Sequence, residues 1–518
     1  MAFIDFFDRG WRANPNGIAY IMGERSYTFT QTRDLTCRIA NGLIAAGLPK
    51  EAKAAVLATN DPLAWICALG LWRAGLAWIP VSPRATGEEN LFILDGFDCE
   101  VLFFHKYFAP MVAEMRPKLP RVKLWICIDD DLPDAPSLEN WSKAQPTTAP
   151  EVDYQMDDII TVMPTGGTTG MPKGVMNTHR SVQTFFAHYM IACPYGSEEH
   201  PVALVAAPMT HTAGVLSVPC TTRGGTVVIL ATPDPAQMFG SIVRHKVTEF
   251  FLPPTVIYRL LEIPGIGKVD FSSLKYFMYG AAPMSVEKLK KAIEVFGPVM
   301  MGGYGQTEAP AAISYLRPDE HFEGGHLASD ERLSSVGRPN PLIRVEIMDD
   351  KNSILGLGET GEICVRGDLV MKGYYKQPDK TADAIVDGWL HTGDVGHLDA
   401  HGYLHITDRK KDMIISGGFN VYPNEVEQVI WAHPAVQDCA VIGVPDEQWG
   451  EAVKAVVELK AGQSVSAEEL IALCKEKIGS VKAPKSIDFI ATLPRSAVGK
   501  VLKKDLRQEY WRTAERKI

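Results

Sequence analysis

The sequence predicts a multidomain α/β protein, and three features of the chain indicate this class. Its 518 residues exceed what one compact core usually holds, since domains average roughly 150 residues. Short apolar runs alternate with helix-like segments through the first several hundred residues, which is typical of a largely parallel sheet covered by helices on both faces. Closely spaced strand patterns begin near residue 338, and a compact mixture of helices and strands begins after residue 411.

The individual elements follow from these patterns in order along the chain. The longest apolar stretch, residues 64–80, contains Arg73 and ends at Pro80, which predicts a buried helix and then a strand, not a membrane span. Apolar runs bounded by Gly, Pro, Asn or Asp predict further strands at 54–58, 101–104, 124–128, 202–207, 226–231, 345–350, 362–367 and 402–409. The last part of the chain predicts helices at 424–433 and 466–478, and strands at 439–445, 452–459 and 486–491.

The composition argues against several classes of protein. The net charge is -10, from 52 Lys and Arg against 62 Asp and Glu, so we expect no general binding to nucleic acid. The nine cysteines lie singly, without a C-x-x-C pair, which argues against a disulfide framework or zinc ribbon and fits a reducing cytoplasm. Asp5 and Asp8 stand where a secretory signal would need basic residues, so we expect neither that signal nor a transmembrane segment.

A loop rich in glycine and threonine, TGGTTGMPKG at residues 165–174, follows a predicted strand. Glycines let backbone N–H groups surround an anion, threonine hydroxyls add donors, and Lys173 adds a positive charge. The loop therefore predicts a polyphosphate site. It is not a Walker A motif, because Met171 and Pro172 separate Gly170 from the lysine.

A second glycine pattern has the spacing of a dinucleotide-binding motif but the wrong context. Gly356, Gly358 and Gly361 form G-x-G-x-x-G between two predicted strands. A dinucleotide fingerprint has to open a helix. We therefore expect a hairpin turn at these glycines.

Three shorter motifs carry aromatic or charged residues that suit nucleotide chemistry. In MGGYGQTE, residues 301–308, Tyr304 is suited to stack on a base, Thr307 to bind phosphate and Glu308 to hold Mg²⁺, although tyrosines also follow glycines in ordinary turns. Asp394 in HTGD, with Arg409 beyond it, fits either a ribose site or a surface salt bridge.

The third motif is PRSAVGK at residues 494–500. It places Lys500 on a glycine-containing turn within a basic tail. Taken alone, a lysine in such a position is usually solvated surface.

The order of these motifs is more specific than any one of them. TGGTTGMPKG, YGQTE, HTGD, DRKKDMIISGGFNVYPNEVE and PRSAVGK follow one another as they do in the adenylate-forming enzymes. The sequence resembles this superfamily of acyl-CoA synthetases, adenylation domains and luciferases over essentially its whole length, and is most similar to AMP-forming acyl- and aryl-CoA ligases. The resemblance implies a large N-terminal domain, residues 1–410, made of two αβ-layered sheets and a small β-rich subdomain at 338–410. It also implies a small, mobile α+β C-terminal lid domain at 411–518.

The resemblance further implies ATP, Mg²⁺, a small carboxylic acid and CoA as the reactants. The residues implied to fold over the ATP phosphates are Thr165, Gly166, Gly167, Thr168, Thr169, Gly170 and Lys173, with Gly166 where the family often has serine, so one hydroxyl contact is in doubt. The residues implied around AMP are Gly280, Ala281, Ala282, Tyr304, Gly305, Thr307, Asp394 and Arg409. Glu308 and Thr165 would ligate Mg²⁺, and Lys500 would stabilise the charge that develops during adenylation.

The same resemblance extends to thioester formation and to the acid. The lid would swing about Lys411, and Gly417 and Gly418 would line the tunnel for the pantetheine arm of CoA. The implied acyl pocket consists of His211, Thr212, Gly214, Met278, Tyr279, Gly303, Ala309 and Pro310, and we expect Gly302 and Gly303 to leave open space in it. Such a lining favours a monocarboxylic acid with an apolar or aromatic body. His211 fits a gate beside the acyl group or a histidine of the core.

Three other functions remain open from the sequence. An adenylating enzyme could load a carrier-protein thiol, although the chain carries no fused carrier domain, which favours CoA. A luciferase-like oxygenase shares the expected fold, but nothing in the sequence requires oxygen chemistry. A non-catalytic nucleotide-binding protein is disfavoured because Lys500, Glu308, Asp394 and Arg409 are all present. The sequence is compatible with a homodimer and does not name the acid.

Overall fold

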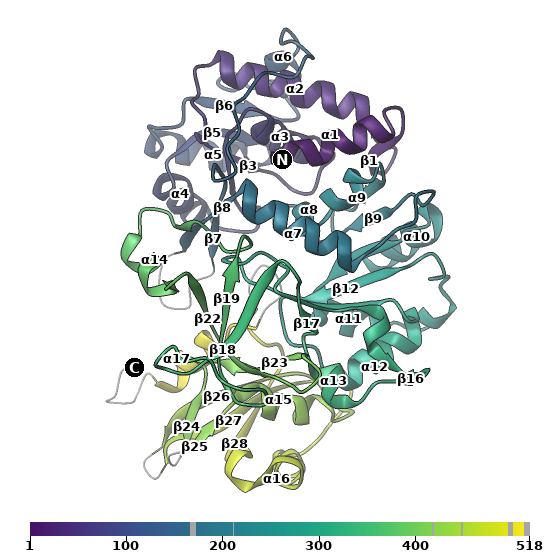
Figure 1. The fold of residues 1–518 in the computed structure, drawn as a ribbon, viewed down its shortest axis with the longest axis vertical. Helices are drawn as coiled ribbons and strands as arrows, with labels where there is room; N and C mark the ends of the chain where they lie inside the picture. Colours follow the sequence, from purple (N-terminus) through teal and green to yellow (C-terminus); the bar gives the residue numbers. More distant parts are fainter. Residues whose placement is uncertain (166–171, 211, 417–418, 447–448, 496–500, 512–518) are drawn as a thin grey trace.

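The computed structural model describes residues 1–165, 172–210, 212–416, 419–446, 449–495 and 501–511. Two large sheets with their helices form the upper part of the molecule in Figure 1, and a separate α+β unit lies at the bottom. Several predicted site residues lie outside the described residues: Gly166, Gly167, Thr168, Thr169, Gly170, His211, Gly417, Gly418 and Lys500.

The first sheet has seven strands in the order β20-β8-β7-β4-β3-β5-β6. Its strands are β3 (Lys53–Leu57), β4 (Ala77–Pro80), β5 (Cys99–Phe104), β6 (Leu124–Cys127), β7 (Ile159–Thr165), β8 (Lys173–Thr178) and β20 (Gly373–Tyr374). The first five of these run parallel, whereas β8 and β20 each run antiparallel to their neighbour. The associated helices are α2 (Phe29–Ala45), α3 (Pro62–Arg73), α4 (Gly87–Gly96), α5 (Ala109–Met115) and α6 (Leu138–Ser142).

Helices cover both faces of this sheet, as its continuous apolar strands require. Ala54 and Val56 of β3 enter the same core cluster as residues of α2 and α3. Ala55 and Leu57, which point the other way, enter a cluster with residues of α4 and α5. Helix α3 begins where Asp61 accepts a hydrogen bond from the Leu63 N–H and Pro62 occupies the first turn.

The second sheet has nine strands in the order β17-β14-β13-β12-β11-β9-β10-β1-β2. Its strands are β1 (Ile18–Met22), β2 (Arg25–Thr28), β9 (Val202–Val205), β10 (Thr226–Ile229), β11 (Glu249–Leu252), β12 (Tyr276–Gly280), β13 (Met300–Tyr304), β14 (Ser314–Leu316) and β17 (Arg338–Pro339). The helices that accompany it are α1 (Phe3–Ala13), α7 (His179–Ala192), α8 (Thr212–Leu216), α9 (Val218–Thr222), α10 (Pro235–His245), α11 (Pro254–Leu261) and α12 (Val286–Phe296). Because strands β9 to β13 are parallel, their carboxyl ends share one edge, where Gly280 and Tyr304 lie.

A third, antiparallel sheet follows the two large ones. It consists of β18 (Ile343–Met348), β19 (Gly361–Gly367), β21 (Ile385–Val386), β22 (Trp389–Leu398) and β23 (Leu404–Arg409). Gly356 and Gly358 lie in the turn between β18 and β19, and Gly358 has a φ of 79°, so the expected hairpin turn is confirmed. The remaining short elements are α13 (Asp330–Ser334), α14 (Pro378–Ala384), β15 (Phe322–Glu323) and β16 (His326–Leu327).

The unit at the bottom of Figure 1 has its own sheet and core. Its elements are β24 (Ile414–Ser416), β25 (Phe419–Val421), α15 (Pro423–Trp431), β26 (Val436–Asp446), β27 (Gly450–Leu459), α16 (Ala467–Lys482), β28 (Ser486–Ile490) and α17 (Lys503–Trp511). A separate cluster of buried side chains, among them Val426, Val441 and Leu470, forms its interior. We call this unit the lid.

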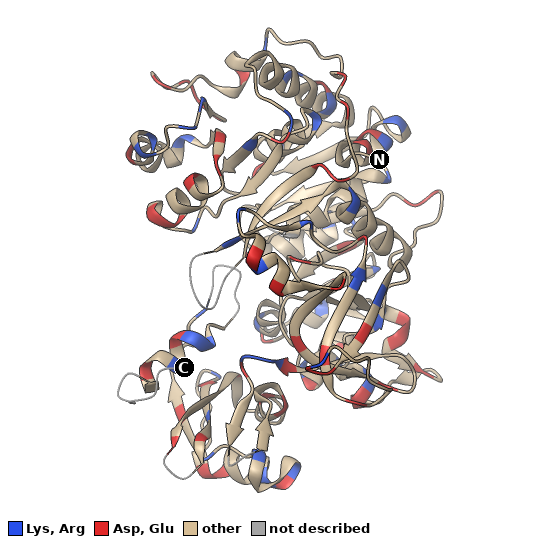
Figure 2. Cartoon of the chain, turned by 60° about the vertical axis from the view of Figure 1, so that its left-hand side comes forward, with Lys and Arg blue, Asp and Glu red and all other residues tan. Residues whose placement is uncertain are grey.

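The predicted fold class is confirmed, and the strands expected from apolar runs are present with ends shifted by a few residues. The lid boundary at Lys411 stays a prediction. Among the described residues, no helix has the length and apolarity needed to cross a membrane. Charges of both signs are spread over the elements in Figure 2, and no single basic face is visible in that view.

A buried ion pair joins the first helix, α1, to helix α3. Arg73 is 2% exposed, and its two terminal nitrogens donate to both carboxylate oxygens of Asp8, at 2.9 and 2.5 Å. Its Nε donates to the hydroxyl of Thr36 on α2 at 2.9 Å. One guanidinium therefore ties together α1, α2 and α3.

Removing the carboxylate should destabilise the protein strongly. In Asp8→Ala the Arg73 charge would remain buried without its partner, and we expect the free energy of unfolding to fall by about 3–5 kcal/mol. The matched control is Asp157→Ala, which removes a solvent-exposed pair with Arg180 and should leave the urea midpoint almost unchanged. Urea unfolding monitored by tryptophan fluorescence would measure both variants, and equal midpoints for the two would contradict the prediction.

Candidate active site

Three strands bring Tyr304, Asp394 and Arg409 together: Tyr304 ends β13, Asp394 lies within β22 and Arg409 ends β23. The Tyr304 hydroxyl donates to Asp394 Oδ2 at 2.8 Å, and Arg409 Nε lies 3.3 Å from Asp394 Oδ1. Asp394 and Arg409 face each other across β22 and β23. The two residues form an ion pair in which Asp394 is buried and the Arg409 side chain is 36% exposed.

A residue that the sequence analysis did not single out completes this group. Gln306 Nε2 donates to Asp394 Oδ2 at 2.6 Å and to the carbonyl of Thr392 at 2.9 Å. Burial raises the pKa of Tyr304, and the neighbouring Asp394 carboxylate raises it further, so the phenol stays a hydrogen-bond donor. Gln306 lies inside the YGQTE motif, and that position was the only hint of its role in the sequence.

The charged residues expected at the phosphates form a second group. Thr165, the last residue of β7, and Lys173, the first residue of β8, are register partners. Lys173 Nζ lies 3.8 Å from the centre of the Tyr374 ring, and the Tyr374 hydroxyl donates to Glu308 Oε1 at 2.8 Å. Burial lowers the pKa of Lys173, and the Glu308 carboxylate partly offsets that shift.

The two groups belong to one site because one short segment serves both. Tyr304 and Gln306 bind Asp394, while Glu308, two residues further on, receives the Tyr374 hydroxyl. The Thr307 carbonyl accepts from Asn177 Nδ2 at 3.3 Å, which fastens this segment to β8. The arrangement thus places a carboxylate with an arginine at one end and a lysine with a carboxylate at the other.

Glycine is required where two strands approach each other beside Tyr304. Gly280 and Gly303 are register partners, and a Cβ on Gly280 would lie 2.6 Å from the Gly303 carbonyl oxygen. Ala281, which follows, has a φ of 66°, a conformation that costs energy for a residue with a side chain. Such strain is often kept at ligand sites, and here it lies at the shared edge of the parallel strands.

The oxygen atoms of Glu308 and Thr165, in the group expected at the phosphates, suit a magnesium ion that is brought in by a nucleotide. Among the described residues, no group of three or more His, Cys, Asp or Glu side chains could hold a resident metal. Glu308 offers a carboxylate and Thr165 a hydroxyl, both hard oxygen donors. Mg²⁺ typically takes only one or two carboxylates and completes its shell with phosphate oxygens and water, so these residues fit that ion.

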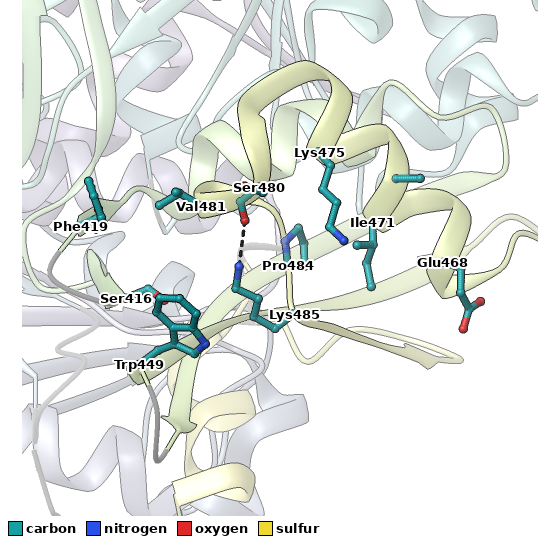
Figure 3. Close-up of a pocket in the computed structure, with 11 residues that line it drawn as sticks. Ser416, Phe419, Trp449, Glu468, Ile471, Lys475, Ser480, Val481, Pro484 and Lys485 are labelled. Atoms are coloured by element: carbon teal, nitrogen blue, oxygen red, sulfur yellow. Dashed lines mark hydrogen bonds between the residues drawn. The ribbon is translucent and has the colours of Figure 1, made fainter.

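A pocket of 630 Å³ lies in the lid, beside the described residues that flank positions 417 and 418. Phe419, Trp449 and Val481 give it apolar walls, and all three are exposed, at 59%, 41% and 43%. Lys475 and Lys485 also line it, and Lys485 Nζ donates to the Ser480 carbonyl at 2.8 Å (Figure 3). Glu468 lines it as well, and Lys485 Nζ lies 5.6 Å from the centre of the Trp449 ring. The pocket therefore combines an indole face with two positive charges and one negative charge.

Two known protein families match most of the chain. AMP-binding enzymes match residues 7–375, and the C-terminal domain of AMP-binding enzymes matches residues 425–500. The chain belongs to the AMP-binding enzyme family. The resemblance to adenylate-forming enzymes that the motifs carry is thereby confirmed.

Individual proteins similar to this AMP-binding enzyme cover most of its length. The medium/long-chain-fatty-acid–CoA ligase FadD8 of Mycobacterium tuberculosis is 39% identical over 73% of this chain and 66% of its own length. A feruloyl-CoA synthase of an Amycolatopsis species is 34% identical over 96% of this chain and 97% of its own. The amide bond synthetase McbA of Marinactinospora thermotolerans shares the fold with a TM-score of 0.88, at 31% identity over 98% of this chain and 99% of its own.

The structure separates the residues predicted for the acyl pocket of this AMP-binding enzyme. Met278 and Gly303 lie on one face of the nine-stranded sheet, whereas Tyr279 points to the other face and its hydroxyl lies 3.1 Å from His321 Nε2. Ala309 is fully buried and Pro310 half-buried, close in sequence to the Tyr304 segment. Tyr279 therefore faces away from Met278 and Gly303, and the residues predicted for the acyl pocket do not all lie on one side of the sheet.

Two further expectations about this region are changed by the structure. Space beside Gly302 and Gly303 is already occupied, because a Cβ there would lie 2.9 Å from the Tyr279 hydroxyl and 3.3 Å from the Tyr315 ring. The expectation of open space at this pair is therefore wrong. A Cβ on Gly214 would lie 2.2 Å from the Met209 carbonyl oxygen, so that glycine serves the tight start of α8, the helix that begins at Thr212.

The predicted hinge lies where contacts to the body and to the lid meet. The Lys410 N–H donates to the Gly393 carbonyl at 2.9 Å, and Asp412 pairs with Arg507 of α17 at 2.8 Å. Burial lowers the pKa of Lys411, and the nearby Arg409 lowers it further. Lys411 thus stands between a residue fastened to β22 and a residue fastened to the lid.

Proposed function

We propose that this AMP-binding enzyme is an acid–thiol ligase that joins a monocarboxylic acid to CoA through an acyl adenylate. The observation that supports this most directly is that residues 304–308 serve both the Asp394–Arg409 group and the Lys173–Glu308 group. A nucleoside triphosphate has a ribose towards one end and anionic phosphates at the other. The Asp394–Arg409 group suits the ribose, and the Lys173–Glu308 group suits the phosphates and their metal. Relatives named as CoA ligases for fatty and aryl acids favour the same chemistry.

In the first half-reaction a carboxylate oxygen of the acid attacks the α-phosphorus of ATP and pyrophosphate leaves. Asp394, assisted by Arg409, would bind the ribose hydroxyls, and Tyr304 with Gly280, Ala281 and Ala282 would hold the adenine. Bound Mg²⁺, held by Glu308 and Thr165, would neutralise charge on the phosphates. Lys173 and the 165–170 loop would hold the leaving pyrophosphate. Lys500 would stabilise the charge that develops at the α-phosphate.

In the second half-reaction the CoA thiol loses its proton and attacks the acyl carbonyl, and AMP leaves. We assign the pantetheine passage to Gly417 and Gly418, and the nucleotide of CoA to the neighbouring lid pocket. An indole face such as that of Trp449 stacks on a base, and Lys475 and Lys485 suit the phosphates. Rotation of residues 411–518 about Lys411 between the two steps would move Lys500 out of the site and bring the pantetheine passage into it.

The acid itself is defined here only by class. Met278, Gly303, Ala309 and Pro310 bring no positive charge to the proposed pocket, which disfavours a second carboxylate on the substrate. His211, which lies outside the described residues, would stand beside the acyl group. We therefore propose an apolar or aromatic monocarboxylic acid as the substrate and the cytoplasm as the place of reaction.

A panel of carboxylic acids tests the proposed function. We expect pyrophosphate release that depends on ATP, Mg²⁺ and the acid, and a CoA thioester as product. Because a second buried carboxylate costs several kcal/mol, kcat/KM for dicarboxylic acids should be lower by about 100-fold or more. Pyrophosphate release without thioester formation, with turnover only on a carrier-protein thiol or an amine, would show the CoA assignment to be wrong.

Lys500→Ala separates the two half-reactions. Removing a donor that stabilises transition-state charge lowers the rate by about 10²–10³-fold, so adenylate formation should fall by that factor. Thioester formation from supplied acyl adenylate should keep its rate, because that step does not use the lysine. Single-turnover assays of each step make the comparison, and equal losses in both would overturn the role given to Lys500.

Trp449→Ala tests the nucleotide end of CoA. Stacking of a base on an aromatic ring contributes about 1–3 kcal/mol, so KM for CoA should rise by about tenfold or more, with the adenylation rate unchanged. The matched control is Phe489→Ala, which removes an equally exposed lid aromatic on β28 that does not line the pocket. The same KM for CoA in both variants would place the CoA nucleotide elsewhere.

A further inference from the structure

We propose that Tyr374 is a positioning residue for the phosphate end of the site: its hydroxyl orients the Glu308 carboxylate, and its ring keeps Lys173 from pairing with that carboxylate. The inference rests on the proposed function, since it assumes that Lys173 and Glu308 act on a magnesium-bound nucleotide. It adds a residue that none of the sequence motifs pointed to.

The geometry places the tyrosine between two opposite charges. The Tyr374 hydroxyl donates to Glu308 Oε1 at 2.8 Å, and Lys173 Nζ lies 3.8 Å from the centre of the same ring. An ammonium is attracted to an aromatic face, and a carboxylate is a strong acceptor for a phenol hydroxyl. One neutral side chain thus satisfies both charged groups at different parts of its surface.

Without this separation the two charges would be drawn to each other. Lys173 and Glu308 are both half-buried, where screening by water is weakened and an ion pair gains strength. A direct pair would take a positive charge away from the phosphates and a carboxylate oxygen away from the metal. Tyr374 is itself uncharged, so it holds each group without neutralising it, which leaves both charges available to the nucleotide.

Tyr374 itself is fixed firmly enough to perform this role. Its side chain is 5% exposed, and its N–H donates to the hydroxyl of Thr381 at 2.8 Å. Strand β20 pairs with β8, the strand that begins at Lys173, and Tyr374 is the register partner of Val175. The Met371 N–H donates to the Glu308 carbonyl at 2.8 Å. Residues 371–374 therefore fasten both the lysine strand and the glutamate loop.

The neighbouring tyrosine supplies a matched control. Tyr375 has the same kinds of contact away from the site: its hydroxyl donates to Asp98 Oδ2 at 2.7 Å. Lys53 and Lys376 lie over its ring, 5.2 and 5.4 Å from its centre. Tyr375→Phe therefore removes a comparable phenol–carboxylate bond without touching Lys173 or Glu308.

The experiment compares Tyr374→Phe, Tyr374→Leu and Tyr375→Phe with the wild-type enzyme. Calorimetry would measure ATP binding over a series of Mg²⁺ concentrations, and single-turnover assays would measure each half-reaction. A hydrogen bond to a charged group is worth enough to change an equilibrium by on the order of 10- to 100-fold. We expect Tyr374→Phe to raise the Mg²⁺ concentration for half-maximal ATP binding and to slow adenylation, each by about that factor.

The remaining outcomes separate this inference from its alternatives. Thioester formation from supplied acyl adenylate should be unchanged in Tyr374→Phe, and Tyr374→Leu, which also frees Lys173 to reach Glu308, should bind ATP more weakly still. If the Phe variants at 374 and 375 share one Mg²⁺ dependence and one adenylation rate, or if Tyr374→Phe lowers only the melting temperature, the inference is overturned. Failure of the wild-type enzyme to adenylate any acid would instead refute the proposed function.

Discussion

The buried carboxylate of Asp394 is the interaction on which the geometry of the site depends. It accepts hydrogen bonds from Tyr304 and Gln306 and pairs with Arg409. Tyr304 ends a strand of the nine-stranded sheet, Asp394 belongs to the third sheet, and Arg409 is two residues from the proposed hinge. The Asp394 side chain thereby joins the nine-stranded sheet, the third sheet and the residues next to the proposed hinge.

The physical reason for this dependence is that a buried carboxylate is costly unless its oxygens are satisfied. Three donors from two different sheets satisfy Asp394, so its position is determined by both sheets at once. The same partners also limit where a ribose could approach, because the oxygens of Asp394 are already oriented before a ligand arrives. Preorganised groups of this kind lose little free energy when they bind a ligand.

Much of this arrangement could be predicted from the sequence, but only where the information is local. Apolar runs indicated β3, β5, β9 and β10 because buried parallel strands need continuous apolar residues. Motif order predicts Asp394, Arg409, Glu308 and Lys173 as members of one site, and the structure pairs Asp394 with Arg409 and places Lys173 and Glu308 on the same tyrosine. The hairpin turn predicted at residues 356–361 is also confirmed. It could be predicted because the strands on either side are visible in the local sequence.

The features that the sequence did not reveal arise from contacts between distant segments. Tyr374 is 66 residues from Glu308 in the chain, and its role depends on the pairing of β20 with β8, which no local pattern specifies. The two faces of β12 are a second feature that the local sequence does not assign. Alternation requires Met278 and Tyr279 to point in opposite directions, yet only the packed sheet shows which direction leads to the site.

The described residues on both sides of Lys500 are fixed to the lid, which bears on the role that we propose for this lysine. Arg495 pairs with Asp438 at 2.7 Å and is bridged to Val501. Lys503 Nζ lies 2.7 Å from Glu427 of α15, and Arg507 is paired with Asp412. Residues on both sides of Lys500 are therefore anchored to the lid core by ion pairs, most of them well shielded from water. If the lid rotates as we propose, these flanking residues would be carried with it, and bringing Lys500 to the α-phosphate would be a question of domain orientation. In that case the lysine to which we assign the adenylation step would need no recognition element of its own beyond the contacts between lid and body, such as the bond from Gln428 to the Met284 carbonyl at 3.3 Å.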